Sequence, residues 1–142
     1  MAESITNLIP HDWQFHHLGH ACKNLEHSQA FFAAMGYTQE GDTFSDDTQG
    51  IRGCFLIGPG PRIELLENLP GRETLTPWLD AGTRLYHMAY LVSSIDKALA
   101  WAREQRGVVT VKPVPAIAFG GRYIAFVMFR QGAMLEFIEA EA

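Results

Sequence analysis

Short apolar runs, separated by glycine, proline and other turn residues, dominate the chain. Many are rich in β-branched and aromatic side chains, which fit a pleated, half-buried surface. Turns are expected at Gly58-Pro59-Gly60-Pro61 and at Phe119-Gly120-Gly121-Arg122. We therefore predict strands around His17 and His87 and at residues 37–44, 53–57, 62–66, 108–112, 123–129 and 134–138.

Two segments have instead the apolar spacing of amphipathic helices, at residues 25–35 and 95–105. Each has an N-cap residue, an acidic residue in the first turn and a glycine suited to a positive φ at the C-terminus. In the first helix these are Asn24, Glu26 and Gly36, and in the second they are Ser94, Asp96 and Gly107. The side chains expected to be buried are Leu25, Phe31, Phe32 and Met35 in the first helix and Ile95, Leu99 and Ala102 in the second, with Trp101 at its margin.

The two halves of the chain repeat each other. Phe15-His16-His17-Leu18 corresponds to Leu85-Tyr86-His87-Met88 seventy residues later. Ile63-Glu64-Leu65 corresponds to Leu135-Glu136-Phe137 seventy-two residues later. Each half reads β-α-β-β-β, with a histidine near its start and a glutamate near its end. The predicted fold class is α+β, with two tandem βαβββ modules in one mixed sheet.

The chain length suits a single domain, which we place at residues 13–142 after an N-terminal tail at 1–12. The first module is expected at 13–67 and the second at 84–140. Residues 68–83 form the linker between them, with a short helix at 75–79 that ends at Ala81-Gly82.

Two carboxylates interrupt apolar strands: Glu64 lies between Ile63 and Leu65, and Glu136 occupies the equivalent place in the second half. A buried carboxylate must be protonated, paired with a cation or bound to a metal, because an unpaired charge costs several kcal/mol. The parity of the strands allows both glutamates to face the same side as the two repeated histidines.

The expected metal ligands are therefore His17, Glu64, His87 and Glu136. Imidazole and carboxylate suit a divalent transition metal such as Zn, Ni, Co, Mn or Fe, and four such ligands leave positions open for water or substrate. A single histidine in an apolar strand is usually an ordinary core residue. The repeat favours the metal, because core packing does not require a His–Glu pair in both halves.

The other histidines receive no role: His11 and His27 are expected in solvent, His16 on the face opposite His17, and His20 away from the metal side. Arg122 is a candidate for binding an acidic substrate group, although a solvated arginine in a turn fits equally well.

The composition favours a small-molecule partner. The formal net charge is −5, and the 11 Lys and Arg residues form no basic stripe, which argues against a nucleic-acid partner. No apolar run approaches the ~20 residues of a membrane span. Cys22 and Cys54 have no paired-ligand spacing, and the first residues lack the pattern of a signal peptide, so we expect a cytoplasmic protein with reduced thiols.

The chain resembles the vicinal oxygen chelate superfamily, which includes glyoxalase I, methylmalonyl-CoA epimerase, extradiol dioxygenases and bleomycin-resistance proteins. The resemblance extends over residues 15–139 and is carried by Phe-His-His-Leu-Gly-His-Ala, Ile-Glu-Leu-Leu-Glu, Leu-Tyr-His-Met-Ala-Tyr-Leu-Val and Met-Leu-Glu-Phe-Ile-Glu. It implies a sheet curled into a half-barrel around a metal cleft, often in a homodimer.

Within the superfamily, Gln49-Gly50-Ile51 and the segment from Trp78 to His87 resemble methylmalonyl-CoA epimerase most. Two positions depart from that pattern. Glu64 stands where epimerases carry glutamine, as in glyoxalase I, and Thr48 stands where they carry an acidic residue proposed as the base. Ala21, in turn, stands where glyoxalase I tends to carry an arginine.

The resemblance implies a metal-dependent isomerase, epimerase or lyase that moves a proton next to a carbonyl through a metal-stabilised enolate. Thioesters and hemithioacetals are the expected substrate types, and Glu136 or Glu64 would be both ligand and base. The alternatives are a small-molecule-binding or antibiotic-resistance protein of the same fold and, third, a ring-cleaving dioxygenase.

Overall fold

The computed structural model describes residues 12–140, so His11 and all of the expected tail except Asp12 lie outside it. Eight strands form one sheet in the order β2-β3-β4-β1-β5-β8-β7-β6. The first module comprises β1 (Gln14–Ala21), α2 (Leu25–Ala34), β2 (Thr38–Asp46), β3 (Ile51–Ile57) and β4 (Ile63–Asn68). The second comprises β5 (Leu85–Val92), α4 (Ile95–Glu104), β6 (Val108–Pro115), η1 (Ile117–Phe119), β7 (Tyr123–Met128) and β8 (Met134–Glu139).

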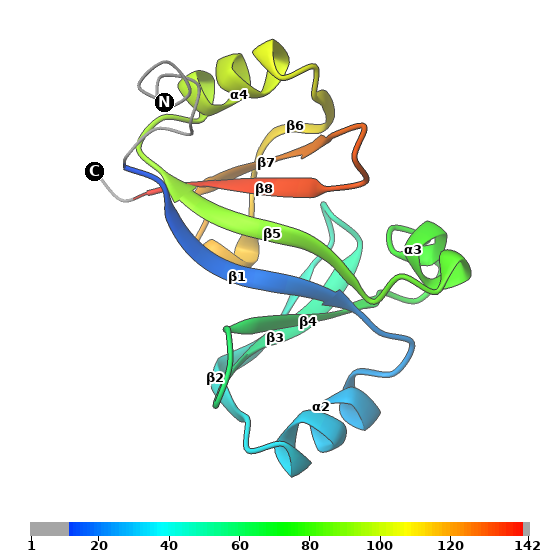
Figure 1. Ribbon diagram of the computed structural model, residues 1–142. Coiled ribbons are helices and arrows are strands. Elements are labelled where there is room, and N and C mark those ends of the chain that lie inside the picture. The colour runs from blue at the N-terminus through cyan, green and yellow to red at the C-terminus, as the bar shows by residue number, and fades with distance from the viewer. Residues whose placement is uncertain (1–11, 141–142) are drawn as a thin grey trace.

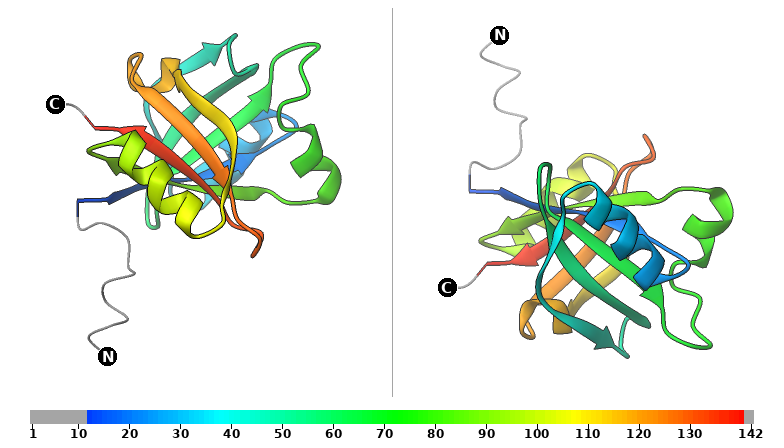
Figure 2. Two further views of the ribbon diagram at one scale, coloured as in Figure 1. Left: turned by 90° about the horizontal axis from the view of Figure 1, so that it is seen from above. Right: turned by 90° about the horizontal axis from the view of Figure 1, so that it is seen from below.

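The sheet is mixed and curled. β1 and β5 pair antiparallel at its centre, and each pairs in parallel with the last strand of its own module, β4 or β8. Figure 1 and Figure 2 show the strands of both modules curving toward the same side, with α2 and α4 on the outside at opposite ends. The predicted α+β class with two βαβββ modules is confirmed.

Most strands extend one to three residues beyond a predicted bound, β6 the furthest, whereas β7 ends at Met128, one residue earlier than predicted. The linker helix, α3, spans Thr76–Ala81 and ends at Gly82, whose φ of 74° is the left-handed conformation expected there. None of the helices formed by residues 12–140 is long and apolar enough to cross a membrane.

Both long helices begin at their predicted caps. The Asn24 side chain accepts a hydrogen bond from the backbone N–H of His27 at 2.9 Å, and the Ser94 hydroxyl accepts one from Lys97 at 3.2 Å. These bonds satisfy donors that the first turn of a helix leaves unpaired.

The predicted burial of α2 is wrong in part. Leu25 and Phe32 are buried, but 63% of Phe31 and 51% of Met35 are exposed. Successive residues of a helix point about 100° apart, so Phe31 cannot contact the sheet that Phe32 covers. Met35 lies just past the last helical residue.

A second correction concerns the end of α4. Gly36 after α2 has the expected positive φ, but after α4 it is Arg106, at φ 65°, that adopts the left-handed conformation. Gly107 is needed instead for close packing, because a Cβ there would lie 2.6 Å from Cγ1 of Val127 and 2.9 Å from Cε1 of Phe129.

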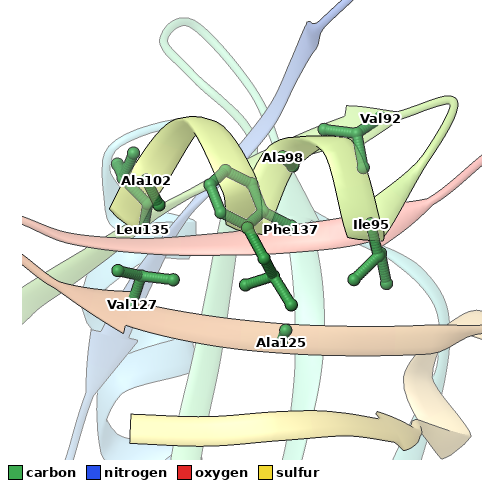
Figure 3. Close-up of a cluster of buried hydrophobic side chains, with 9 residues drawn as sticks. Val92, Ile95, Ala98, Ala102, Ala125, Val127, Leu135 and Phe137 are labelled. Atoms are coloured by element: carbon green, nitrogen blue, oxygen red, sulfur yellow. The ribbon is translucent and has the colours of Figure 1, made fainter. Parts of the chain in front are cut away.

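The apolar cores lie between the sheet and the outer helices. Under α4, Phe137 packs with Ile95, Ala98 and Ala102 (Figure 3). Under α2, Leu65 packs with Leu25 and Phe32. Because side chains alternate along a strand, burial of Leu65 and Phe137 on the outer face directs Glu64 and Glu136 to the concave inner face.

Candidate metal centre

Four adjacent central strands bring four polar side chains to the concave face: His17 from β1, Glu64 from β4, His87 from β5 and Glu136 from β8. All four are buried, with exposed fractions between 0% and 4%. They are the four residues singled out in the sequence.

The strand register arranges them in two rows. Glu64 and His87 lie on either side of Gly19 in β1. His17 and Glu136 lie on either side of Ala89 in β5. Gly19 and Ala89 are equivalent residues, each two positions after the histidine of its own module. A small residue at each place leaves room for the larger side chains beside it.

The fit is closest at Gly19. A Cβ added there would lie 1.9 Å from Cε1 of His87 and 2.2 Å from its Nδ1. No side chain larger than hydrogen can occupy this position while His87 keeps its orientation. The site therefore requires glycine two residues after His17.

The polar atoms of the four side chains nearly touch. His17 Nε2 lies 3.0 Å from Glu64 Oε1 and 3.3 Å from Glu136 Oε1. His87 Nε2 lies 3.2 Å from Glu136 Oε1 and 3.6 Å from Glu64 Oε1. The two Nε2 atoms are 3.1 Å apart.

The two histidines and the two carboxylates shift one another's ionisation. Burial is the largest influence on the pKa of His17 and lowers it, but the neighbouring Glu64 and Glu136 together outweigh burial and raise it to about 9. The pKa of His87 is raised by the same pair of carboxylates against burial. Burial raises the pKa of Glu64, but His17 and His87 bring it down to about 2. Without a metal, the carboxylates therefore stay ionised and the histidines hold protons, which a bound cation would replace.

The donor set and its spacing fit one divalent metal ion. Ligands about 2.1 Å from a common centre are separated by about 3.0 to 3.4 Å in octahedral or tetrahedral arrangements, and the spacing observed between histidine and carboxylate atoms is 3.0 to 3.6 Å. Glu136 Oε1 is buried, and although Nε2 of His17 and Nε2 of His87 lie 3.3 and 3.2 Å away, neither makes a well-aligned hydrogen bond with it. A metal ion bound among these atoms would satisfy the carboxylate oxygen.

His16 corrects a prediction, because it does not lie on the opposite face from His17. The pairing of β1 with β5 shifts register between Phe15 and His17, and this irregularity brings Nδ1 of His16 to 2.7 Å from Nδ1 of His17. Burial, and then the nearby His17 and Arg62, lower the pKa of His16 to about 4. A neutral His16 can accept the Nδ1–H of His17, which leaves Nε2 of His17 free to bind a metal.

A cavity of about 500 Å³ adjoins the four side chains. Glu64 and Glu136 form part of its wall, and Tyr86 packs edge-on against His87 with ring centroids 4.5 Å apart. Most of the remaining wall is aromatic or aliphatic, including Trp78, Phe119, Phe126 and Met128. The sequence predicted a strand at residues 123–129 but did not single out Phe126 and Met128 as residues of a cavity wall. Their alternation on β7, next to Glu136 on β8, was the signal for a cavity wall.

A contact between the modules lies beside the cavity, whose wall includes Gln49 and Phe119. Asp46, at the end of β2, is buried and accepts hydrogen bonds from the backbone and side-chain N–H groups of Gln49 and from the backbone N–H of Ile117. Ile117 begins η1, whose Phe119 stacks on His17 with ring centroids 6.0 Å apart. Asp46 was not singled out in the sequence, because its η1 partner lies 71 residues away.

The remaining sequence candidates lie around this centre. Thr48 lines the cavity, whereas neighbouring Asp47 does not. Arg122 is half-buried in the turn between η1 and β7 and does not line the cavity, so its proposed contact with substrate stays a prediction.

Two further histidines lie where they were expected. His20 packs edge-on against Phe32, away from the four side chains. His27 is exposed on α2.

Comparison with known proteins gives one family and several similar folds. A family model described as Glyoxalase/Bleomycin resistance protein/Dioxygenase superfamily matches residues 16–126. No curated protein matches the sequence. The crystal structure of hypothetical protein BH1468 from Bacillus halodurans C-125 has a TM-score of 0.79 and 24% identity, covering 92% of this chain and 96% of that chain.

Two similar structures are methylmalonyl-CoA epimerases. The Mycobacterium tuberculosis enzyme has a TM-score of 0.73 and 23% identity, covering 90% of this chain and 88% of that chain. A variant of the Streptomyces coelicolor enzyme, in complex with 2-nitronate-propionyl-CoA, has a TM-score of 0.69 and 23% identity, covering 91% of this chain and 98% of that chain. At these identities the likeness shows the fold.

Proposed function

The chain belongs to the glyoxalase/bleomycin resistance protein/dioxygenase superfamily, and from this premise we propose that it is a metal-dependent enzyme that moves a proton next to a carbonyl group. One observation carries the proposal. His17, Glu64, His87 and Glu136 surround one point at the wall of a cavity large enough for a small molecule. The reaction would be that of an isomerase, an epimerase or a lyase.

The four side chains would hold one Zn, Ni, Co, Mn or Fe ion. A divalent ion at this place supplies a Lewis acid that stabilises negative charge developing on a carbonyl oxygen. His17 and His87 would hold the ion through Nε2, and the hydrogen bond between His16 and His17 would keep the His17 ring in the required tautomer.

The proton is moved by Glu64 or Glu136. Among residues 12–140 these are the two acidic side chains on the cavity wall. Thr48, at the position where epimerases carry an acidic residue, offers only a hydroxyl group. Each glutamate has a second carboxylate oxygen, so one group can act both as ligand and as base.

Relatives support the reaction class but not the substrate. The two structures named above are methylmalonyl-CoA epimerases, and their fold matches this chain over 90% or more of its length. Glu64 replaces the glutamine of that pattern and makes the donor set that of glyoxalase I. Thioesters and hemithioacetals are therefore both candidate substrates.

Elemental analysis of protein purified without an affinity tag tests the site. We expect about one equivalent of a transition metal per chain, lost in His87→Ala and in Glu136→Ala. His27→Ala is the matched control, because His27 is exposed and far from the four side chains in the fold. Bound metal lost in neither variant would contradict the ligand assignment. Protein that binds none of the five metals would favour the metal-free binding protein.

Proton exchange tests the reaction. The metal-loaded protein should exchange the proton next to the carbonyl of acyl-CoA thioesters or hemithioacetals with D2O. Glu64→Gln and Glu136→Gln should each slow the exchange by a factor of ~100 or more, the typical contribution of a general base. Unchanged exchange in both variants would refute the role of these carboxylates.

Three further statements remain proposals. We propose that residues 13–142 form one domain, with modules at 13–67 and 84–140 and the linker at 68–83. We propose a homodimer, since the central strands expose Phe15, Leu85 and Met88, and a monomer by light scattering would refute it. A cytoplasmic location agrees with Cys22 and Cys54, which are both buried and unpaired.

A further inference from the structure

We infer that the part of the substrate that enters the cavity carries the reacting carbonyl on an uncharged, apolar body about the size of an aromatic ring. This inference rests on the proposed function, because it assumes that the reacting carbonyl lies beside Glu64 and Glu136. It goes further in specifying the part of the substrate that enters the cavity.

The charges on the wall argue against an anionic substrate. Of the cavity-lining residues in the part of the chain that the structure describes, Glu64 and Glu136 alone carry a charge, and none is Lys, Arg or His. Two carboxylates and a divalent ion sum to zero, whereas one carboxylate and a glutamine, as in the epimerase pattern, leave a net charge of +1. The centre of this chain therefore offers no excess positive charge to a carboxylate of the substrate.

The rest of the wall would leave an anionic group without compensation. A buried charge needs a partner of opposite sign or several hydrogen bonds. Tyr86 also lines the cavity, and its hydroxyl can offer a hydrogen bond but no positive charge.

The shape and lining of the cavity fit an apolar ring. Trp78 and Tyr86 lie with their ring centroids 5.4 Å apart, and Phe119 and Phe126 also line the cavity. Aromatic walls of this kind bind flat, apolar groups in stacked or edge-to-face contacts. Met128, Met134 and the aliphatic residues complete a volume of about 500 Å³, ample for a ring with a short side chain.

The neutral character extends to the rim. Thr48 and Thr110 are exposed at the edge of the cavity, and Thr74 lines it while donating its hydroxyl to the backbone carbonyl of Gln49 at 2.7 Å. The side-chain N–H of Gln49 is held by Asp46. These groups can hydrogen-bond a neutral substrate, but they supply no cation.

Two probes of nearly equal shape test the inference. 1-Phenylbutane-2,3-dione and phenylpyruvate both carry a benzyl group on a ketone, with a second oxygen on the neighbouring carbon. In the dione that carbon belongs to a neutral acetyl group, and in phenylpyruvate it belongs to a carboxylate. We expect the metal-loaded protein to bind the dione at least tenfold more tightly by isothermal titration calorimetry.

A variant at the rim supplies the matched control. Thr110→Lys adds a cation that remains in solvent, because Thr110 is exposed, and should reduce the preference for the dione by improving phenylpyruvate binding severalfold. Thr110→Gln adds length without charge and should not improve it. If phenylpyruvate binds the wild-type protein as tightly as the dione, or if neither probe binds, the inference is wrong.

Exchange of the benzylic protons with D2O, followed by NMR in the same samples, separates the two proposals. If the dione binds selectively but its protons do not exchange above the uncatalysed rate, the result would contradict the proposed reaction. It would still support the preference of the cavity for an uncharged ligand. Exchange with both probes, together with equal binding, would support the reaction and overturn the preference.

Discussion

Gly19 separates Glu64 from His87 in the sheet, and its hydrogen atom occupies the place of a side chain. Gly19→Ala should destabilise the protein by roughly 1–3 kcal/mol, the usual cost of overpacking, because the new Cβ would overlap the His87 ring. Metal binding should be lost as the ring moves. Urea unfolding and metal titration measure both effects.

A double variant checks the cause. With His87→Ala the ring is absent, and Gly19→Ala should then cost clearly less than in the wild-type background. Equal cost in both backgrounds would show that the backbone of β1, rather than the imidazole, requires glycine.

His16 is predicted to increase the metal affinity of the site without being a ligand. His16→Ala should weaken metal affinity by about 10–100-fold, because His17 loses the acceptor that fixes its tautomer. His16→Asn keeps an acceptor near the same place and should restore part of the affinity, as measured by chelator competition. His27→Ala on α2 is the matched control, and an effect equal to that of His16→Ala would indicate a non-specific origin.

The pH dependence of the metal-free protein follows from the shifted pKa values in and beside the candidate site. The pKa of His17 is raised from 6.5 to about 9, so its stabilising contribution is complete below pH 6.5 and is lost as pH rises through 9. The pKa of Glu64 is lowered from 4.5 to about 2, so its contribution is complete above pH 4.5 and is lost as pH falls through 2. The pKa of His16 is lowered from 6.5 to about 4, so its protonation in the unfolded state reduces stability as pH falls below 6.5. Stability in a chelator should therefore be highest near pH 6.5.

Chemical unfolding between pH 6.5 and 9 measures this effect. The free energy of unfolding should fall by on the order of 2 kcal/mol, since one pKa unit corresponds to about 1.4 kcal/mol. Metal affinity should rise over the same range, because the ion replaces protons on the histidines. A metal-free stability that rises from pH 6.5 to 9 would rule out the protonated cluster.

At the scale of elements, η1 depends on Asp46 at the end of β2. Asp46→Ala removes the acceptor of three hydrogen bonds and should lower the free energy of unfolding by roughly 2–3 kcal/mol. Phe119 should also become more mobile over His17, which hydrogen exchange at residues 117–119 would detect. Asp47→Ala is the matched control because Asp47 is exposed, and it should change stability little.

At the scale of the whole molecule, a metal ion would join the two modules. His17 and Glu64 come from the first module, and His87 and Glu136 come from the second. Free metal at 100 times its Kd should stabilise the folded protein by about 2.7 kcal/mol, because binding requires both modules to be in place. Thermal unfolding with and without a chelator measures this shift. His87→Ala should show no response to the chelator, and an equal response would place the metal elsewhere.

Several features of the fold and of the candidate site could be predicted from sequence. The caps at Asn24 and Ser94 depend on residues a few positions apart, so local chemistry was sufficient. The strands followed from short apolar runs for the same reason. The repeat singled out Glu64 and Glu136, because a carboxylate twice placed in an apolar strand needs a partner wherever the chain folds.

Other features could not be predicted, since they depend on contacts between distant segments. The register shift in β1 that turns His16 toward His17 arises in the pairing with β5. The burial of Phe32 rather than Phe31 depends on which side of α2 faces the sheet. Gly107 was predicted to adopt a positive φ at the end of α4, which it does not. Glycine is needed there because a Cβ would be too close to Val127 on β7.

The sequence by itself determined the two-module α+β architecture and the four polar residues of the candidate site, because periodicity, capping and the cost of a buried charge act at short range. Only the tertiary structure decided how Gly19 and Ala89 separate those residues and that Asp46 holds η1 across the modules. It also decided that, among residues 12–140, only two carboxylates bring charge to the cavity wall. Strand register, bulges and cavity walls are set by packing between residues far apart in the chain, and no local pattern records that packing.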